Sequence, residues 1–328
     1  MNIKRVVLAI ICFFIMTSLA FSDQPEENKM TLPRIPIYTF FFNIIFEPFP
    51  FPVIGFINNA IGNHVGLQTG FVNINTKNFY GLQAGYVNTA GGSLRGLQSG
   101  FVNVTAGNFS GFQGGFVNVT AENFLGLQAG FFNVSRNNLI GVQLGCINIT
   151  GKETKGVQIG LLNITEDLEG ITIGLLTIVK NGGYHAFEYY FSEFFTYNVA
   201  FRTGKKSFYN SFIASYNQTS DFSFDNFAFG YGIGTFISIN EVLYINPELN
   251  NISINQLFKA SIDYYSLIVY LGVNLGKFSI AAGPSATFAH TFSKDAKISR
   301  PLYSIYSYDF DDKNIFVIGA RISARLSI

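Results

Sequence analysis

The ten residues "GLQAGFFNVS", 126–135, belong to a unit that recurs along the chain without a gap. Each copy reads Gly-(Leu/Val/Phe)-Gln-x-Gly-x-x-Asn and spans fifteen residues. The opening glycines are Gly66, Gly81, Gly96, Gly111, Gly126, Gly141 and Gly156. A half-copy precedes them at 55–58, and a decayed copy, one residue shorter, begins at Gly170. A fixed period of this kind predicts a repeat architecture in which each copy is one structural unit.

Two glycines, one glutamine and one asparagine define the unit, and we assign them a structural role. In three of the copies these residues are Gly66, Gln68, Gly70, Asn73, Gly111, Gln113, Gly115, Asn118, Gly126, Gln128, Gly130 and Asn133. The glutamines could line a pore or bind a polar ligand, but we expect their amides to pair with neighbouring strands. The Asn-x-Ser/Thr triplets match a glycosylation acceptor. We instead expect turn or ladder chemistry for these asparagines.

The first nine positions of each unit suit a β-strand, whose side chains alternate between two faces. In "GFQGGFVNV", 111–119, this alternation separates Gly111, Gln113, Gly115 and Val117 from Phe112, Gly114, Phe116 and Asn118. These nine-residue stretches carry no charge. The charged residues fall in the last five positions of their units, at Lys77, Arg95, Glu122, Arg136, Lys152, Glu153 and Lys155. Each unit therefore reads as a strand followed by a turn.

Two architectures satisfy this pattern. In a β-solenoid, each unit forms one coil and identical residues stack in ladders, which explains why seven units tolerate no insertion. In a membrane β-barrel, each unit forms one strand, and recent duplication explains the constant length. We favour the barrel because a soluble solenoid should carry charge on its outward strand faces. The expected fold class is therefore an all-β antiparallel membrane barrel, with a solenoid followed by a smaller C-terminal barrel as the alternative.

The C-terminal part, 181–328, carries longer alternating segments and is expected to form antiparallel barrel strands. The clearest are "NFAFGYGIGTFISI" at 226–239, "FSIAAGPSATFAHTF" at 278–292 and "FVIGARISARLSI" at 316–328. In each, aromatic and aliphatic residues alternate with small or polar ones, as lipid-facing barrel strands require. In the last segment, the small and polar face includes Arg321 and Arg325.

Composition agrees with a membrane protein that crosses by strands. Of 328 residues, 48% are hydrophobic, 16% are aromatic and only 12% are charged, against roughly 25% charged in an ordinary soluble domain. Beyond the N-terminus, no apolar run reaches the roughly 18 residues that a spanning helix needs. A closed β-barrel is the other structure that pairs every backbone group inside lipid. The formal net charge of +1 argues against a nucleic-acid partner.

The N-terminus reads as an export signal. Residues 1–22 combine Lys4 and Arg5 with an apolar core and a small-residue end, and a Pro- and aromatic-rich lead-in follows at 23–54. The repeat region is placed at 55–180. Removal of the signal would leave Cys146 as the single cysteine, which excludes an internal disulfide framework. We therefore expect an exported protein, in the outer membrane or at the cell surface, with outer-membrane lipid as its partner.

The chain also resembles a known family. The tandem "GLQxGxxN" units, the junction "IVKNGGYHAFEYY" at 178–190, "FRTGKKSFYN" at 201–210 and "FGYGIGT" at 229–235 are similar to bacterial surface-repeat proteins of spirochaetes and related Gram-negative groups. The resemblance implies an outer-membrane or cell-surface location. It supplies no catalytic residues.

Enzymatic function is not indicated. His64, His185 and His290 are far apart in sequence and lack cysteines or carboxylates at ligand spacing, so neither a metal nor another cofactor is expected. The basic stretch "RTGKK", 202–206, is interpreted as a solvated turn, and His290 as an interface residue near a barrel rim. The expected role is structural, or binding of a host or extracellular ligand through loops. The alternative is a passive porin-like channel.

Overall fold

The computed structural model describes residues 36–47, 49, 51–217, 226–256, 260–291, 293 and 298–328. The predicted signal peptide, 1–22, and the first part of the lead-in, 23–35, lie outside the described residues. The described part of the chain is all-β, which confirms the predicted class. The chain divides into two compact units, one ending at Ile171 and the other comprising Thr172–Ile328.

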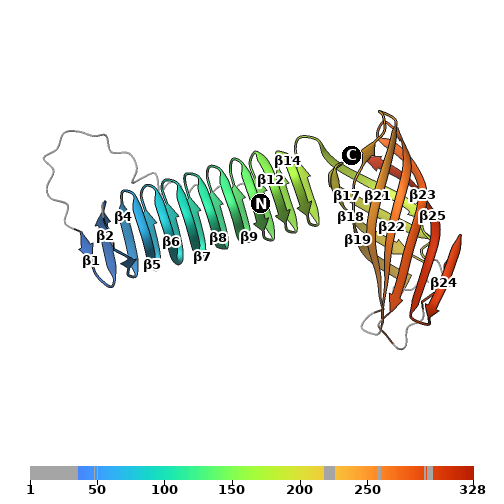
Figure 1. Ribbon diagram of the computed structural model, residues 1–328, viewed down its shortest axis with the longest axis horizontal. Helices are drawn as coiled ribbons and strands as arrows, with labels where there is room; N and C mark the ends of the chain where they lie inside the picture. The colour runs from blue at the N-terminus through green and yellow to red at the C-terminus, as the bar shows by residue number, and fades with distance from the viewer. Residues whose placement is uncertain are drawn as a thin grey trace, which may run out of the picture. The chain divides into compact units, whose positions relative to one another are not determined.

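The repeat region, together with strands at 37–54 that the sequence had assigned to the lead-in, forms a β-solenoid of about nine coils (Figure 1). Its strands are β1 (Ile37–Tyr38), β2 (Phe42–Phe46), β3 (Val53–Ile54), β4 (Ile57–Ile61), β5 (His64–Asn75), β6 (Phe79–Ala90), β7 (Leu94–Thr105), β8 (Phe109–Thr120), β9 (Phe124–Ser135), β10 (Leu139–Leu144), β11 (Ile147–Thr150), β12 (Glu153–Ile159), β13 (Leu162–Thr165), β14 (Asp167–Ile173) and β15 (Leu176–Val179).

Successive coils pair in parallel, with a register shift of one repeat. Gln113 of β8 pairs with Gln98 of β7, and Asn118 with Asn103, so each residue lies beside its equivalent in the next coil. The alternative prediction, a solenoid followed by a smaller barrel, is therefore the one confirmed, and the preferred assignment of the repeats to barrel strands was wrong. Alternation could not separate the two, because parallel and antiparallel strands share the same two-residue period.

The predicted faces of the repeat strand also need correction. Gln113 and Asn118 were placed on opposite faces, yet both are fully buried inside the coil, whereas Phe116 is 41% exposed. The chain turns a corner at Gly115 and Phe116, so the side-chain alternation is broken there. A Cβ on Gly115 would fall on the carbonyl oxygen of Gly100 in the preceding coil, which explains the glycine at this position.

The glycine that opens each unit has a different role. Gly111 has a φ of +136°, a conformation that side-chain-bearing L-residues rarely adopt. A Cβ on this residue would also collide with the carbonyl oxygen of Gly96. The opening glycines of successive coils thus lie against one another in a column. This column continues into the decayed copy, where Gly170 lies against Gly156.

The C-terminal unit is a closed antiparallel barrel of eight strands within the described residues (Figure 1). Its strands are β16 (Gly183–Phe191), β17 (Tyr197–Lys205), β18 (Phe208–Tyr216), β19 (Phe227–Gly234), β21 (Leu243–Gln256), β22 (Ala260–Leu275), β23 (Phe278–Thr291) and β25 (Asn314–Ser327). The short strands β20 (Ile237–Ser238) and β24 (Tyr306–Asp311) pair with β21 and β25. Pairing of β16 with β25 closes the barrel.

The two ends of the barrel differ. One end of the barrel holds the turns 206–207 and 276–277, the connection 235–242, the start of β16 and the end of β25; we call it the short-turn end. The connections 217–226 and 292–313 join strands at the opposite, long-connection end.

Candidate functional site

A ladder of asparagines runs through the interior of the solenoid. Each Nδ2 donates to the Oδ1 of the asparagine fifteen residues later, over 2.6–2.9 Å, from Asn43 to Asn163. Asn118 Nδ2 donates to Asn133 and also, over 2.8 Å, to the carbonyl oxygen of Ala129. Both polar ends of the amide are therefore used, as a buried amide requires. The triplets that match a glycosylation acceptor have these buried amides as their asparagines.

A parallel ladder of glutamines occupies the facing wall. Gln113 Nε2 donates to Gln98 Oε1 over 2.8 Å, and Gln128 Nε2 donates to Gln113 Oε1 over 2.7 Å. The ladder runs from Gln68 to Gln158, and every glutamine in it is fully buried. These amides bond to one another inside the coil and are sealed from solvent. They leave no polar surface for a ligand.

The sequence-defined residues therefore fall into two groups within each coil. The glutamines and asparagines, Gln68, Asn73, Gln113, Asn118, Gln128 and Asn133, form the ladders. The glycines, Gly66, Gly70, Gly111, Gly115, Gly126 and Gly130, occupy the two columns described above, with Gly66, Gly111 and Gly126 at positive φ.

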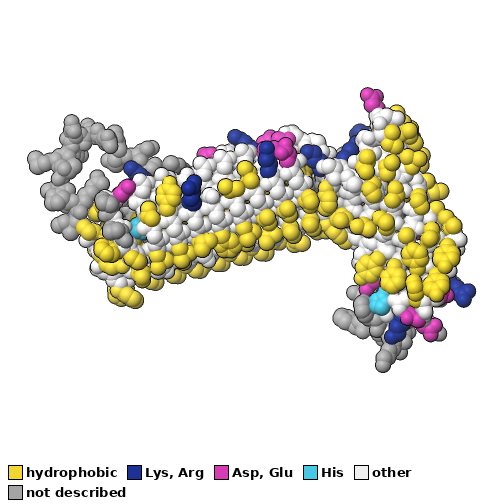
Figure 2. All heavy atoms as spheres, viewed as in Figure 1, with side chains coloured by type: hydrophobic (Ala, Val, Ile, Leu, Met, Phe, Trp, Pro, Cys, Tyr) yellow, Lys and Arg dark blue, Asp and Glu magenta, His cyan; other side chains and the backbone are white. Residues whose placement is uncertain are grey.

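A stacked row of aromatic side chains lies on the outside of the solenoid, at the corner of each coil. We call it the aromatic edge, and its members are Phe56, Phe71, Tyr86, Phe101, Phe116 and Phe131. Neighbouring ring centroids are 4.9–5.0 Å apart, and the six side chains are 41–53% exposed. Figure 2 shows a band of hydrophobic side chains along one edge of the solenoid, and the charged side chains together with further hydrophobic ones along the other.

The barrel interior contains a buried cluster of four charges. Arg202 forms ion pairs with Glu188 and, over 2.5 Å, with Glu248. Arg325 Nε lies 2.7 Å from Glu188 Oε1, and its Nη2 lies 3.3 Å from Glu248 Oε1. Two guanidinium groups therefore balance two carboxylates, as burial of charge requires. We call these residues the central cluster.

Aromatic side chains close the central cluster from the short-turn end. The Arg325 guanidinium lies 5.4 Å from the ring centroid of Phe236 and 5.1 Å from that of Tyr270. The Phe236 ring in turn packs edge-on against Tyr184. These contacts leave the cluster enclosed by rings.

A second ion pair lies nearer the long-connection end. The connection 192–196, between β16 and β17, folds into the barrel and buries Glu193, Phe194 and Phe195. Glu193 accepts from Arg321 Nε over 3.0 Å and from the hydroxyl of Ser285. Arg321 also donates to Ser266 Oγ over 2.8 Å. We call this part of the chain the inner plug, because it fills the lumen from that end.

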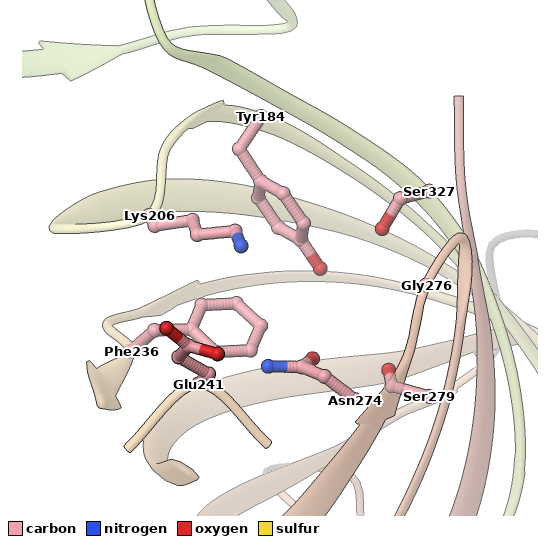
Figure 3. A pocket seen from close by; sticks show the side chains of 8 residues that line it. All are labelled: Tyr184, Lys206, Phe236, Glu241, Asn274, Gly276, Ser279 and Ser327. Atoms are coloured by element: carbon pink, nitrogen blue, oxygen red, sulfur yellow. The ribbon is translucent and has the colours of Figure 1, made fainter. Parts of the chain in front are cut away.

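A pocket of about 250 Å³ opens at the short-turn end of the barrel. Figure 3 shows its labelled side chains pointing toward one another: Tyr184, Lys206, Phe236, Glu241, Asn274, Ser279 and Ser327, with Gly276 at a turn. Phe236 separates the pocket from the central cluster. The lining joins one cation and one carboxylate to hydroxyl and amide groups, which suits a small polar solute.

The three histidines remain apart. His64 is buried in the solenoid beside Phe79, with 5.6 Å between ring centroids. His185 lies on β16, and His290 on β23, where its Nδ1 is 2.7 Å from Asn314 Oδ1 and its ring stacks on Phe288. No group of three or more histidines, cysteines or carboxylates in the described residues could hold a metal ion.

The interpretation of "RTGKK" as a solvated turn was wrong for most of its length, because residues 202–205 belong to β17 and residues 202–204 are buried. Lys206 is exposed at the turn after β17, but Arg202 is fully buried in the central cluster. The turn begins only at Lys206. Arg202 lies within strand β17, where its side chain points into the barrel. The partner Glu248 lies 46 residues away, so no local signal joins the two.

Sequence reasoning also missed the other cluster residues as a group. The alternation in 316–328 had placed Arg321 and Arg325 on the small and polar face, which is the inner one. The same alternation in "YHAFEYY", 184–190, could have placed Glu188 opposite them.

No protein-family model, curated protein or solved structure matches this chain. The resemblance to surface-repeat proteins therefore stays a prediction. No helix in the described part of the chain is long and apolar enough to span a bilayer.

Proposed function

We propose that this protein is a non-enzymatic outer-membrane or cell-surface repeat protein with a structural or ligand-binding role. The barrel serves as its membrane anchor, and the solenoid is the module that the anchor carries. The exterior of the barrel supports contact with lipid. Large apolar side chains on its strands are 48–69% exposed, among them Phe187, Phe229, Leu271 and Ile322, while Glu188, Arg202, Glu248, Arg321 and Arg325 are buried. This distribution is the one that a lipid-facing barrel requires.

The filled lumen favours an anchor over a channel. An eight-stranded barrel is just wide enough for side chains to fill. Here the central cluster and the inner plug occupy that space, with Arg202, Arg321 and Arg325 each at most 2% exposed. A solute would have to displace paired charges and packed rings, so we favour the anchor over the passive porin-like channel.

Strand topology supports a particular orientation. In outer-membrane barrels the short turns face the periplasm and the longer loops face outward. The chain enters β16 from the solenoid at the short-turn end. We therefore propose that the solenoid lies on the periplasmic side, and that a host or extracellular ligand would meet the long-connection end instead.

The function can be tested by separating conduction from binding. The purified full chain would be inserted into planar bilayers, and ionic current recorded under voltage. We expect no stepwise conductance, because the lumen is closed by paired side chains. Steps comparable with those of an open porin run in parallel would favour the channel.

Binding is the second arm of the test. Proteoliposomes carrying the full chain would be compared with empty liposomes for adhesion to host cells and immobilised matrix proteins. Specific adhesion would support a ligand-binding role. If neither conductance nor adhesion is found, the structural role is favoured.

A further inference from the structure

The aromatic edge is the largest feature of the solenoid that its internal packing does not explain. Its rings contribute little to the coil interior, since each is 41–53% exposed and stacks on its neighbours along the edge; Phe116 and Phe131 also contact Phe132 edge-on. The flanking positions are small or half-buried, as with Gly115 and Val117 beside Phe116. The edge is therefore a row of six stacked rings, with Phe132 beside its last two members and the exposed Leu82 and Leu97 on the same coils.

Charge is segregated from this edge. Lys77, Glu122, Arg136 and Lys152 are exposed at the turns, and Figure 2 shows the charged side chains along the opposite side of the solenoid. The charges are thus confined to one side, although exposed apolar side chains such as Tyr80 and Ile140 lie in register with Arg95 and Lys155 there. Amphipathic elements with aromatic and aliphatic residues on one side and charges on the other lie at the boundary between headgroups and acyl chains.

The exposed area argues for lipid over a second copy of the chain. An aromatic side chain buries roughly 150–250 Å² when fully covered. Six half-exposed rings therefore offer on the order of 500 Å², below the roughly 800 Å² per partner of a stable protein interface. Insertion of a narrow aromatic row into an interfacial layer needs no such matched surface.

The link between the solenoid and the barrel is short, which also favours lipid as the occupant. Only residues 180–182 separate β15 from β16, the first barrel strand. A barrel in a bilayer would hold the solenoid close to the membrane, where a short tether gives effective concentrations in the millimolar range. A weak affinity of the edge for lipid then suffices.

We propose that the aromatic edge docks on a phospholipid membrane surface, with the rings in the interfacial layer and the charged turns facing away. This proposal rests on the membrane location proposed for the barrel. The occupant is the bilayer beside the barrel itself, on its short-turn side.

The chain contains no tryptophan, so single tryptophans can report local surroundings. Three variants of the full chain would be reconstituted in phosphatidylcholine vesicles with or without brominated phosphatidylcholine. Phe116→Trp reports the aromatic edge, Glu122→Trp reports the charged turns of the same coil, and Phe229→Trp reports the barrel exterior.

We expect blue-shifted emission and about twofold quenching by brominated lipid for Phe116→Trp, as for an interfacial side chain. Glu122→Trp should emit as a water-exposed indole and remain unquenched. Phe229→Trp should be quenched, which verifies the anchor independently. Circular dichroism in the same vesicles would confirm that all three variants are folded.

The other outcomes overturn the proposal in distinguishable ways. Red, unquenched emission from Phe116→Trp with quenched Phe229→Trp refutes docking and leaves the anchor standing. Blue but unquenched emission from Phe116→Trp assigns the edge to a protein partner such as a second copy. Equal quenching of Phe116→Trp and Glu122→Trp shows unoriented adsorption, whereas an unquenched Phe229→Trp refutes the membrane anchor itself.

Discussion

At the residue scale, the solenoid depends on amides that complement themselves. A primary amide carries a donor and an acceptor, so identical residues stacked in register can satisfy one another. Asn118 shows this directly, because it accepts from Asn103 and donates to Asn133. The exact fifteen-residue period follows, since one inserted residue would break both ladders at once.

Replacing Asn118 by alanine should therefore destabilise the solenoid. The change leaves Asn103 Nδ2, Asn133 Oδ1 and the carbonyl oxygen of Ala129 without one partner each. We expect a loss of about 2–3 kcal/mol in the free energy of unfolding, because buried polar groups are left unsatisfied. Urea unfolding followed by circular dichroism measures this.

The matched control is Asn123→Ala in the same coil. Asn123 bonds to Asn108 across neighbouring turns, but it is exposed. We expect a change within about 0.5 kcal/mol, as for ordinary surface substitutions. Equal losses in the two variants would contradict a structural role for the buried ladder.

At the element scale, a column of apolar side chains lies in the solenoid interior, four residues before the glutamine ladder in each coil. Phe79, Leu94, Phe109, Phe124 and Leu139 stack in successive coils and are buried. His64 occupies the equivalent place one coil before Phe79. Burial lowers the pKa of His64, and hydrogen bonding to the backbone of Leu67 opposes this only in part.

The lowered pKa of His64 predicts a pH dependence. Because the unfolded chain binds the proton more readily than the folded one, the neutral imidazole favours folding above about pH 6.5, and this stability is lost as the pH falls below it. Amide hydrogen exchange of β5, compared at pH 7.5 and 5.5, should show weaker protection in acid after correction for intrinsic rates. His64→Leu should remove the difference. An unchanged pH response in that variant would rule out His64 as its source.

In the barrel, the central cluster resembles the ladders in that its buried polar groups bond to one another. Arg202→Ala would leave Glu188 and Glu248 sharing only Arg325, and we expect a loss of about 3–5 kcal/mol because a buried charge loses its partner. Thermal unfolding in detergent would measure this. Lys206→Ala, at the exposed turn of the same hairpin, should change stability little. A similar effect of both changes would argue against the cluster.

These cases show what the sequence could predict. The period, the strand-plus-turn unit and the inner face of the last strand are local patterns, and they follow from residues such as Gly111 and Arg321. The parallel pairing of the repeats could not be predicted in this way, because the sequence of one strand does not show which strand it pairs with. The ion pair between Arg202 and Glu248 joins β17 to β21, and only the closed barrel brings them together.

At the scale of the whole molecule, the proposed orientation makes the solenoid inaccessible from outside the cell. An epitope inserted in 217–226 should bind antibody on intact cells. The same epitope between Ala121 and Glu122, at an exposed solenoid turn, should bind only after the outer membrane is permeabilised. Labelling of the solenoid epitope on intact cells would reverse the orientation.

The proposed anchor requires the C-terminal unit to be an integral membrane barrel. It is tested most directly by the gel mobility of the full chain taken from carbonate-washed membranes, with and without boiling. We predict that the chain stays with the membranes and runs as a compact, heat-modifiable species, because its strand hydrogen bonds close on themselves through β16 and β25. Release by carbonate, with the same mobility before and after boiling, would show that the unit is not an integral barrel.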